Sequence, residues 1–137
     1  MTHQCETEVR ELHQFFQEWF RGDLPNTSES FARFADVLEE GFQMIVPGGV
    51  PCGRAALLER LQAAYGLDLQ SKIWVEKIDA RALGPDLFLV TYEEWQTRAS
   101  GDKGRLSSAL FRGQPSAPNG VVWLHLHETW LPAEDSP

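Results

Sequence analysis

Apolar residues in the first part of the chain recur at spacings of three and four. This period places them on one face of an amphipathic helix, which we expect to end near Gly22, with Pro25 beyond it as a stop. The apolar face carries Val9, Leu12, Phe16, Trp19 and Phe20.

Two shorter helices are predicted next. The first has apolar positions within residues 31–38 and is closed by Gly41. Ahead of it, Asn26 stands three residues before Glu29, which is a variant of the capping box. The second covers about residues 53–65 and ends at a glycine.

The second half of the chain has the pattern of strands. A short strand at residues 42–46, followed by a Pro-Gly-Gly turn, already precedes the third helix. Long runs rich in β-forming residues come after it, and the stretches between them are hairpin connections. We therefore expect an antiparallel meander with strands at residues 72–83, 87–98, 105–112 and 121–131.

Three helices followed by such a meander predict an α+β fold. The helices should pack on one face of a strongly curved antiparallel sheet, and this arrangement encloses a conical pocket. The chain has no linker, repeat or low-complexity segment. We expect a single domain over residues 1–137, with a frayed tail from about residue 132.

Charge and composition exclude several classes of partner. The formal net charge is −8, with 20 acidic against 12 scattered basic residues, which argues against nucleic-acid binding. No apolar run approaches a membrane span, the first residues are too polar for a secretory signal, and there are two cysteines. We expect a cytoplasmic protein with reduced thiols. Five Trp and eight Phe are many for this length, which indicates a wide or aromatic-lined interior.

The element order resembles the nuclear-transport-factor-like superfamily, which includes ketosteroid isomerases and SnoaL-type polyketide cyclases. The most specific part is "RLSSALFR", which leads through a loop to "WLHLHETWLP". These stretches are similar to a bacterial subfamily of uncharacterised function, and the second also resembles the last strand of the calmodulin-dependent kinase association domain. The resemblance implies a cystatin-like cone with a pocket, and a homodimer formed through the outer sheet face. It does not imply one reaction.

The side chains that face the pocket are predicted from charge pairing between strands. Placing Lys77 opposite Glu94 gives an attractive pair, whereas a shift of one residue sets Glu76 against Glu94. The first register, continued through the hairpins, gives a pocket lined by Glu76, Glu93, Glu128 and Ser108 among Trp19, Tyr65, Trp74 and Trp95. The opposite face, with Trp123, His125, Tyr92 and Phe111, is then the expected dimer interface.

The stretch "WLHLHETW" at residues 123–130 raises the question of a metal site. His125 and His127 lie on one side of an alternating strand, and Glu128 lies on the other. A zinc site needs a third and usually a fourth ligand on the same side. We therefore predict no metal and no other cofactor, and we place the histidines on the outer face.

Two kinds of function stay open. The chain is predicted to bind a small, neutral or cationic, partly aromatic ligand through the pocket residues named above. Alternatively it is a cofactor-free isomerase, dehydratase or cyclase in which Glu93 and Glu128 move protons, because a carboxyl buried among aromatic groups has a raised pKa. If Glu93 and Glu128 are both paired to arginine or capped by the backbone, the enzyme interpretation weakens sharply. The pattern of ketosteroid isomerase, with two catalytic aspartates, is not matched here.

Overall fold

The computed structural model describes residues 1–132, so the predicted frayed tail lies almost wholly outside the described residues. It contains three helices, α1 (Thr2–Arg21), α2 (Ser28–Ala35) and α3 (Arg54–Ala63). Gly22 ends α1 in the left-handed region at φ 78°, as the sequence predicts. At the start of α2 the cap is Thr27, one residue beyond the predicted Asn26, and its side chain accepts a hydrogen bond from the Ser30 amide at 3.2 Å.

The strands form one six-stranded sheet in the order β2-β1-β6-β5-β4-β3. The four C-terminal strands make the predicted antiparallel meander, but β1 runs parallel to β6, so the sheet is mixed. The predicted α+β class is confirmed. The strands are β1 (Leu38–Val46), β2 (Val50–Gly53), β3 (Ile73–Gly84), β4 (Leu87–Arg98), β5 (Gly101–Gly113) and β6 (Val121–Trp130).

The sequence places the start of β1 too late and does not reveal β2. Leu38 continues the apolar spacing of α2, yet it pairs with Trp123 in the sheet, and the Trp123 amide donates to the Val37 carbonyl at 2.8 Å. Tertiary pairing with β6 here outweighs the local helical pattern. β2 is a four-residue edge strand containing a proline, so it has no alternating pattern of its own.

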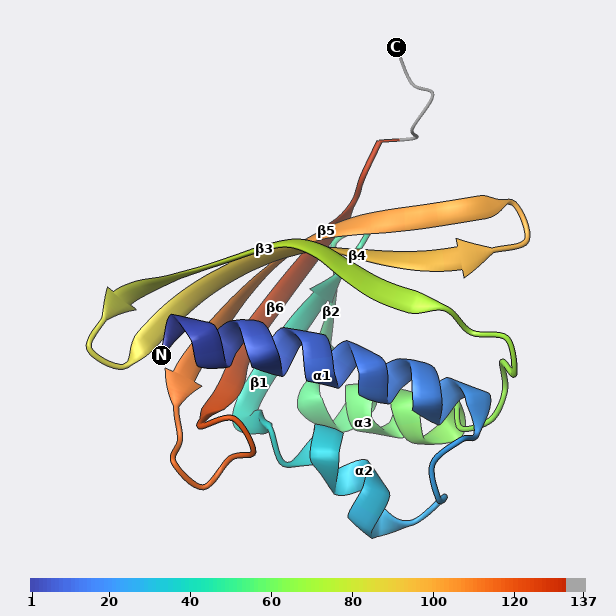
Figure 1. Ribbon diagram of the computed structural model, residues 1–137, viewed down its shortest axis with the longest axis horizontal. Coiled ribbons are helices and arrows are strands. Elements are labelled where there is room, and N and C mark those ends of the chain that lie inside the picture. The colour runs from blue at the N-terminus through green and yellow to red at the C-terminus, as the bar shows by residue number, and fades with distance from the viewer. Residues whose placement is uncertain (133–137) are drawn as a thin grey trace.

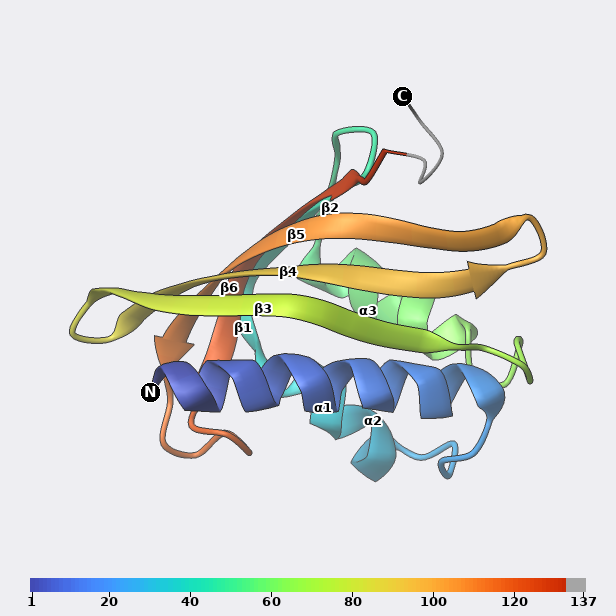
Figure 2. The same cartoon turned by 45° about the horizontal axis from the view of Figure 1, so that its top comes forward.

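All three helices lie on one side of the curved sheet (Figure 1). Helix α1 runs along β3 (Figures 1 and 2), and in Figure 1 α3 and α2 lie below α1, on the same side of the sheet. The opposite face of the sheet carries no helix (Figures 1 and 2).

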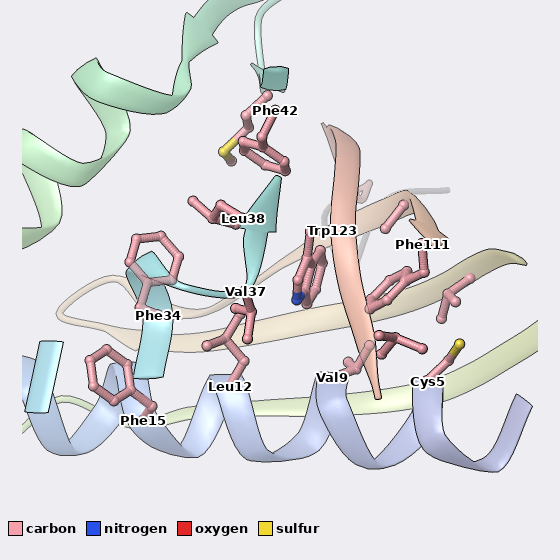
Figure 3. Packing of buried hydrophobic residues seen from close by; sticks show 14 of the residues in the cluster. Cys5, Val9, Leu12, Phe15, Phe34, Val37, Leu38, Phe42, Phe111 and Trp123 are labelled. Carbon is pink, nitrogen blue, oxygen red and sulfur yellow. The ribbon is translucent and has the colours of Figure 1, made fainter. Parts of the chain in front are cut away.

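The core lies where α1 and α2 meet the inner sheet face (Figure 3). From α1, Val9 and Leu12 point toward Trp123 of β6, and Phe111 of β5 lies beside that indole with ring centroids 4.4 Å apart. Trp123 and Phe111 are buried, and so is Tyr92 of β4. The prediction that these three aromatic residues form an outer dimer interface is wrong.

Register shifts in β3 and β6 explain the inverted faces. The pairing of β3 with β4 shifts by one residue between Ala82 and Gly84, so Ala80 lies opposite Val90, and by one more between Glu76 and Asp79, where Lys77 has φ 55°. In β6 one extra residue separates the partners of Leu110 and Phe111. An extra residue reverses which side chains face inward, and a prediction by simple alternation fails beyond it.

Candidate ligand cavity

The inner sheet face and the helices enclose a cavity of about 490 Å³. Its walls are mostly apolar: Leu126 on β6 and its register partner Met44 on β1 belong to the sheet wall, and Leu61 belongs to α3. The polar side chains in its lining are His13, Arg60, Tyr92, Glu94, Gln96, Arg105 and Glu128.

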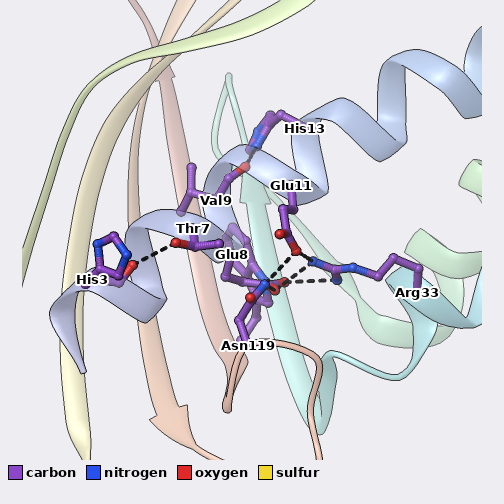
Figure 4. A network of polar contacts seen from close by, with 9 residues as sticks. His3, Thr7, Glu8, Val9, Glu11, His13, Arg33 and Asn119 are labelled. Carbon is purple, nitrogen blue, oxygen red and sulfur yellow. Dashed lines mark hydrogen bonds and ion pairs between the residues drawn. The ribbon is translucent and has the colours of Figure 1, made fainter.

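His13 lies on the buried face of α1, and both of its ring nitrogens are hydrogen-bonded. Nδ1 lies 2.7 Å from the Val9 carbonyl oxygen (Figure 4), and Nε2 lies 2.8 Å from Oε1 of Glu94. A carbonyl only accepts, so Nδ1 carries a proton. The remaining proton lies between Nε2 and the carboxylate, and the Glu94 charge favours the imidazolium.

Arg105 on β5 connects the two carboxylates of the cavity. Its Nη1 donates to Oε1 of Glu128 at 2.8 Å, and its Nε lies 3.9 Å from Oε2 of Glu94. Ser107, two residues along β5, donates to Oε2 of Glu128 at 3.1 Å. Oε2 of Glu94 also accepts from Gln96 at 2.8 Å.

The pKa shifts follow from this arrangement. Burial disfavours the charged form of Glu94, but its hydrogen bond and charge interaction with His13, aided by Arg105, lower its pKa to about 2. Burial likewise opposes a charged His13, yet the Glu94 carboxylate raises its pKa above the ordinary value. For Glu128, burial and the nearby Glu94 charge raise the pKa despite the bond to Arg105.

Tyr92 stands next to this cluster. In the sheet it lies opposite Ser107, which lies opposite Glu128, so the three form a row across β4, β5 and β6. Its side chain is 1% exposed. Among the residues that the structure describes, its hydroxyl is the one buried side-chain polar atom without a hydrogen-bond partner. Burial, then the charges of Glu128 and Glu94, raise its pKa well above 10, while the nearby Ser107 hydroxyl lowers it in part, so the hydroxyl stays protonated. Ser107 donates its own proton to Glu128, and its geometry toward Tyr92 is not that of a formed hydrogen bond.

Of the two glutamates predicted to be catalytic, the structure places one in the cavity. Glu128 is buried there, as predicted, beside Glu94 rather than Glu93. Glu93 lies on the outer face, where Lys77 Nζ approaches it at 3.4 Å and Trp95 donates to it at 3.1 Å. The predicted inward direction of Glu93 is wrong, because the register shift between Ala82 and Gly84 puts the inward Ala80 of β3 opposite Val90, on the face of β4 that does not carry Glu93.

The other predicted ligand-binding residues lie outside the cavity lining. Trp74 stacks on Trp95, with ring centroids 6.4 Å apart, and donates to Glu76 at 2.8 Å, all on the outer face. Ser108 is exposed on that face as well, whereas its neighbour Ser107 faces inward. The prediction that these four residues face the pocket is wrong.

Trp19 and Tyr65 join α1 to the end of α3. The Trp19 indole donates to the Leu61 carbonyl at 2.7 Å, and the Tyr65 hydroxyl donates to the backbone carbonyls of Gly22 and Leu24. Their rings meet edge to face at 4.7 Å. Both side chains fix the helices that border the cavity instead of lining it.

The sequence did carry a signal for some of the missed residues. His13 lies next to Leu12 on the apolar stripe of α1, where a polar residue requires a buried partner. Glu94 and Arg105 are in the predicted strands, but their inward direction depends on the register that the bulge sets. Tyr92 lies on the same face of β4 as Glu94, so the register error that hides the inward direction of Glu94 also puts Tyr92 on the outer face in the prediction.

A second buried cluster holds α1 against α2 and the loop before β6. The carboxylate of Glu8 accepts hydrogen bonds from Arg33 at 2.8 Å, from Asn119 at 3.0 Å and from the Trp123 indole at 3.0 Å (Figure 4). Both of its oxygens are thus satisfied, which indicates a structural role.

Within residues 1–132, no three His, Cys, Asp or Glu side chains are grouped so as to hold a metal ion. His125 and His127 point away from Glu128, on the predicted side of β6. No described helix is both long and apolar enough to cross a membrane.

Comparison with protein families finds a match over almost the whole chain. A family model described as Sucrose-6-phosphate phosphohydrolase C-terminal matches residues 5–132. Sucrose-phosphatase 1 of Nicotiana tabacum is 26% identical over 128 residues, which are 90% of this chain and 30% of that protein. Probable sucrose-phosphatase 2 of Arabidopsis thaliana is 24% identical over 126 residues, 90% of this chain and 29% of that protein. The chain therefore spans less than a third of the length of these relatives.

Solved structures confirm the nuclear-transport-factor-like fold. An NTF-2-like protein of unknown function from Pseudomonas aeruginosa has a TM-score of 0.83 at 25% identity, covering 94% of this chain and 99% of that one. A cystatin-like domain of unknown function from Nostoc punctiforme has a TM-score of 0.64 at 18% identity, with 95% and 79% covered. A calcium/calmodulin-dependent kinase II association domain from Exiguobacterium sibiricum has a TM-score of 0.63 at 17% identity, with 96% and 93% covered.

Proposed function

The chain belongs to the Sucrose-6-phosphate phosphohydrolase C-terminal family, and we propose that this domain binds a small, uncharged and largely apolar molecule in its cavity. The observation that carries the proposal is the enclosed space of about 490 Å³ with apolar walls and one polar cluster. Ligand pockets commonly combine such walls with a few well-placed polar groups.

The charge of the polar cluster supports a neutral ligand. His13 and Arg105 carry two positive charges when protonated, and Glu94 and Glu128 carry two negative charges when ionised. The four charges of this cluster then balance, and Arg60, which also lines the cavity, adds one more positive charge. A cationic ligand would thus meet a lining of net positive charge and would add a buried charge without a partner, which is costly. The cationic ligand that the sequence also allows is therefore disfavoured.

The longer plant relatives are named sucrose-phosphatase. A phosphate ester fits the mostly apolar walls poorly, because His13 and Arg105 are already paired with Glu94 and Glu128, which leaves Arg60 to meet its negative charge. We therefore propose that the ligand of this domain is not the phosphate ester that the name sucrose-phosphatase implies for the relatives.

Binding is better supported than acid–base catalysis. Glu93 pairs with Lys77 on the outer face, and Glu128 pairs with Arg105 inside. Glu128 is thus paired to an arginine, and Glu93 lies outside the cavity, so the two glutamates do not act on one shared space. The raised pKa of Glu128 would suit a proton shuttle, but a proton on Oε1 competes with the hydrogen bond from Arg105, and a proton on Oε2 competes with that from Ser107.

The test uses Nile red, an uncharged dye whose emission strengthens and moves to the blue in apolar surroundings. Wild-type protein is expected to bind it, and Leu126→Trp, which fills the cavity, is expected to abolish the signal. Leu69→Trp is the matched control, because Leu69 is exposed in the loop after α3. Equal binding by wild type and Leu126→Trp would contradict the proposal.

We also propose that the domain self-associates through the outer sheet face. That face carries the stacked Trp74 and Trp95 and the exposed Leu106, and contiguous apolar groups of this kind favour a protein contact. The kinase association domains share only the fold with this chain, so the outer face itself supports the proposal. Sedimentation velocity at micromolar concentration is the test.

A further inference from the structure

The charged acceptors of the cavity's polar cluster are engaged, and some of its donors are available. Each of the four carboxylate oxygens of Glu94 and Glu128 already accepts a hydrogen bond, and both ring nitrogens of His13 are used. Two donors of the cluster remain available beside them. One is the Tyr92 hydroxyl, and the other is the guanidinium of Arg105, which has five N–H donors and gives one of them to Glu128.

Tyr92 cannot turn its hydroxyl toward water. The residue is 1% exposed, the His13 ring packs edge to face on it at 5.3 Å, and Trp123 does so at 6.5 Å. A buried hydroxyl without a hydrogen-bond partner is destabilising. Among the described residues, every other buried side-chain nitrogen or oxygen has a partner. Tyr92 lines the cavity, so a molecule in that space can relieve the deficit.

We propose that the cavity selects molecules that carry a hydrogen-bond-accepting oxygen, such as a ketone or ether, and that the Tyr92 hydroxyl donates to this oxygen while the apolar walls hold the rest. Arg105, whose side chain is 21% exposed, supplies a second donor at the same end. This inference rests on the proposed function and specifies its ligand class. An acceptor oxygen is favoured over a hydroxyl or amine donor because each carboxylate oxygen of the cluster already accepts a hydrogen bond, whereas the Tyr92 proton has no acceptor.

The test compares 2-acetylnaphthalene with 2-ethylnaphthalene, which differ by the carbonyl oxygen. Their affinities are measured by displacement of Nile red from the wild type, from Tyr92→Phe and from Tyr65→Phe. The chain has two tyrosines, and the Tyr65 hydroxyl already bonds to backbone carbonyls, so Tyr65→Phe is the matched control. We expect the ratio of ketone affinity to hydrocarbon affinity to fall about five- to ten-fold in Tyr92→Phe, the effect of one lost hydrogen bond, and to stay unchanged in Tyr65→Phe.

A second measurement needs no variant. The carbonyl stretching frequency of bound 2-acetylnaphthalene should shift down relative to the ketone in hexane, as it does for a hydrogen-bonded ketone. An unshifted carbonyl band, or the same affinity ratio in all three proteins, would overturn the inference while the cavity proposal stands. Failure of both naphthalenes to displace the dye would overturn this inference and the proposed function together.

Discussion

At the scale of single residues, the buried charges of this domain are matched one by one. Glu8 is fully buried and receives donors from α2, from the β5–β6 loop and from β6. Glu94 receives them from α1 and from its own strand. Buried carboxylates without such partners would change their ionisation or destabilise the fold. The two clusters differ in that only the Glu94 cluster borders the cavity.

The lowered pKa of Glu94 predicts a specific loss of stability in acid. Its pKa in the folded protein is about 2, against an ordinary value of 4.5. A carboxyl with a lowered folded pKa contributes stability above the unfolded pKa, and this contribution is lost as the pH falls from about 4.5 toward 2. His13 and Arg105 face Glu94 with positive charge, and Glu128 faces it with negative charge.

The measurement is urea denaturation between pH 7 and pH 2. In Glu94→Gln the free energy of unfolding should be lower at pH 7 and should fall less steeply through the acid range than in the wild type. Glu93→Gln, one residue along the strand but on the outer face, is expected to keep the wild-type slope. An equal slope in wild type and Glu94→Gln would show that the His13 contact does not lower this pKa.

At the scale of elements, the types and order of the helices and of the meander strands could be predicted, and the faces of the strands could not. Periodicity placed β4 at the residues it occupies, because its flanking turns are clear. The inward side chains of β4 are Phe88, Val90, Tyr92 and Glu94. The sequence pattern instead predicts Tyr92 on the outer face and Glu93 in the pocket. Lys77 adopts a positive φ at a bulge, and no residue type in the sequence announces that position. In β6 the predicted inward direction of Glu128 agrees with the structure. Glu128 lies after the bulge between Trp123 and His125, so the bulge changes the direction of Trp123 and leaves that of Glu128 as predicted.

Helix α3 is expected to be the least protected of the three helices. None of its residues is fully buried, whereas α1 buries seven. It is held through the contacts of Trp19 and Tyr65 at one end and those of Arg54, which donates to the carbonyls of Ala35 and Leu38, at the other. Local opening requires little free energy where few apolar contacts are broken.

Amide hydrogen exchange measures this difference. The amides of α3 should exchange well before those in the middle of α1, and a cavity ligand should slow the α3 exchange because Leu57 and Leu61 line the cavity. Exchange of α1 and α3 at the same rate would show that the domain opens only as a whole.

At the scale of the whole molecule, the helices cover one face of the sheet and leave the other available for a second copy (Figure 2). The last prediction concerns this outer face. Leu106 is 45% exposed there and lies opposite Glu93 in the register of β4 and β5. In Leu106→Lys the ammonium can pair with Glu93 across the strands, so the fold should be retained. Burying the same charge in a contact between two copies is costly, so association should be lost.

In sedimentation velocity the wild type is expected at twice the chain mass and Leu106→Lys at the chain mass. Leu69→Lys changes an equally accessible leucine in the loop after α3, away from the sheet, and should sediment like the wild type. A monomeric wild type, or a dimer that persists in Leu106→Lys, would exclude the outer face as the site of association.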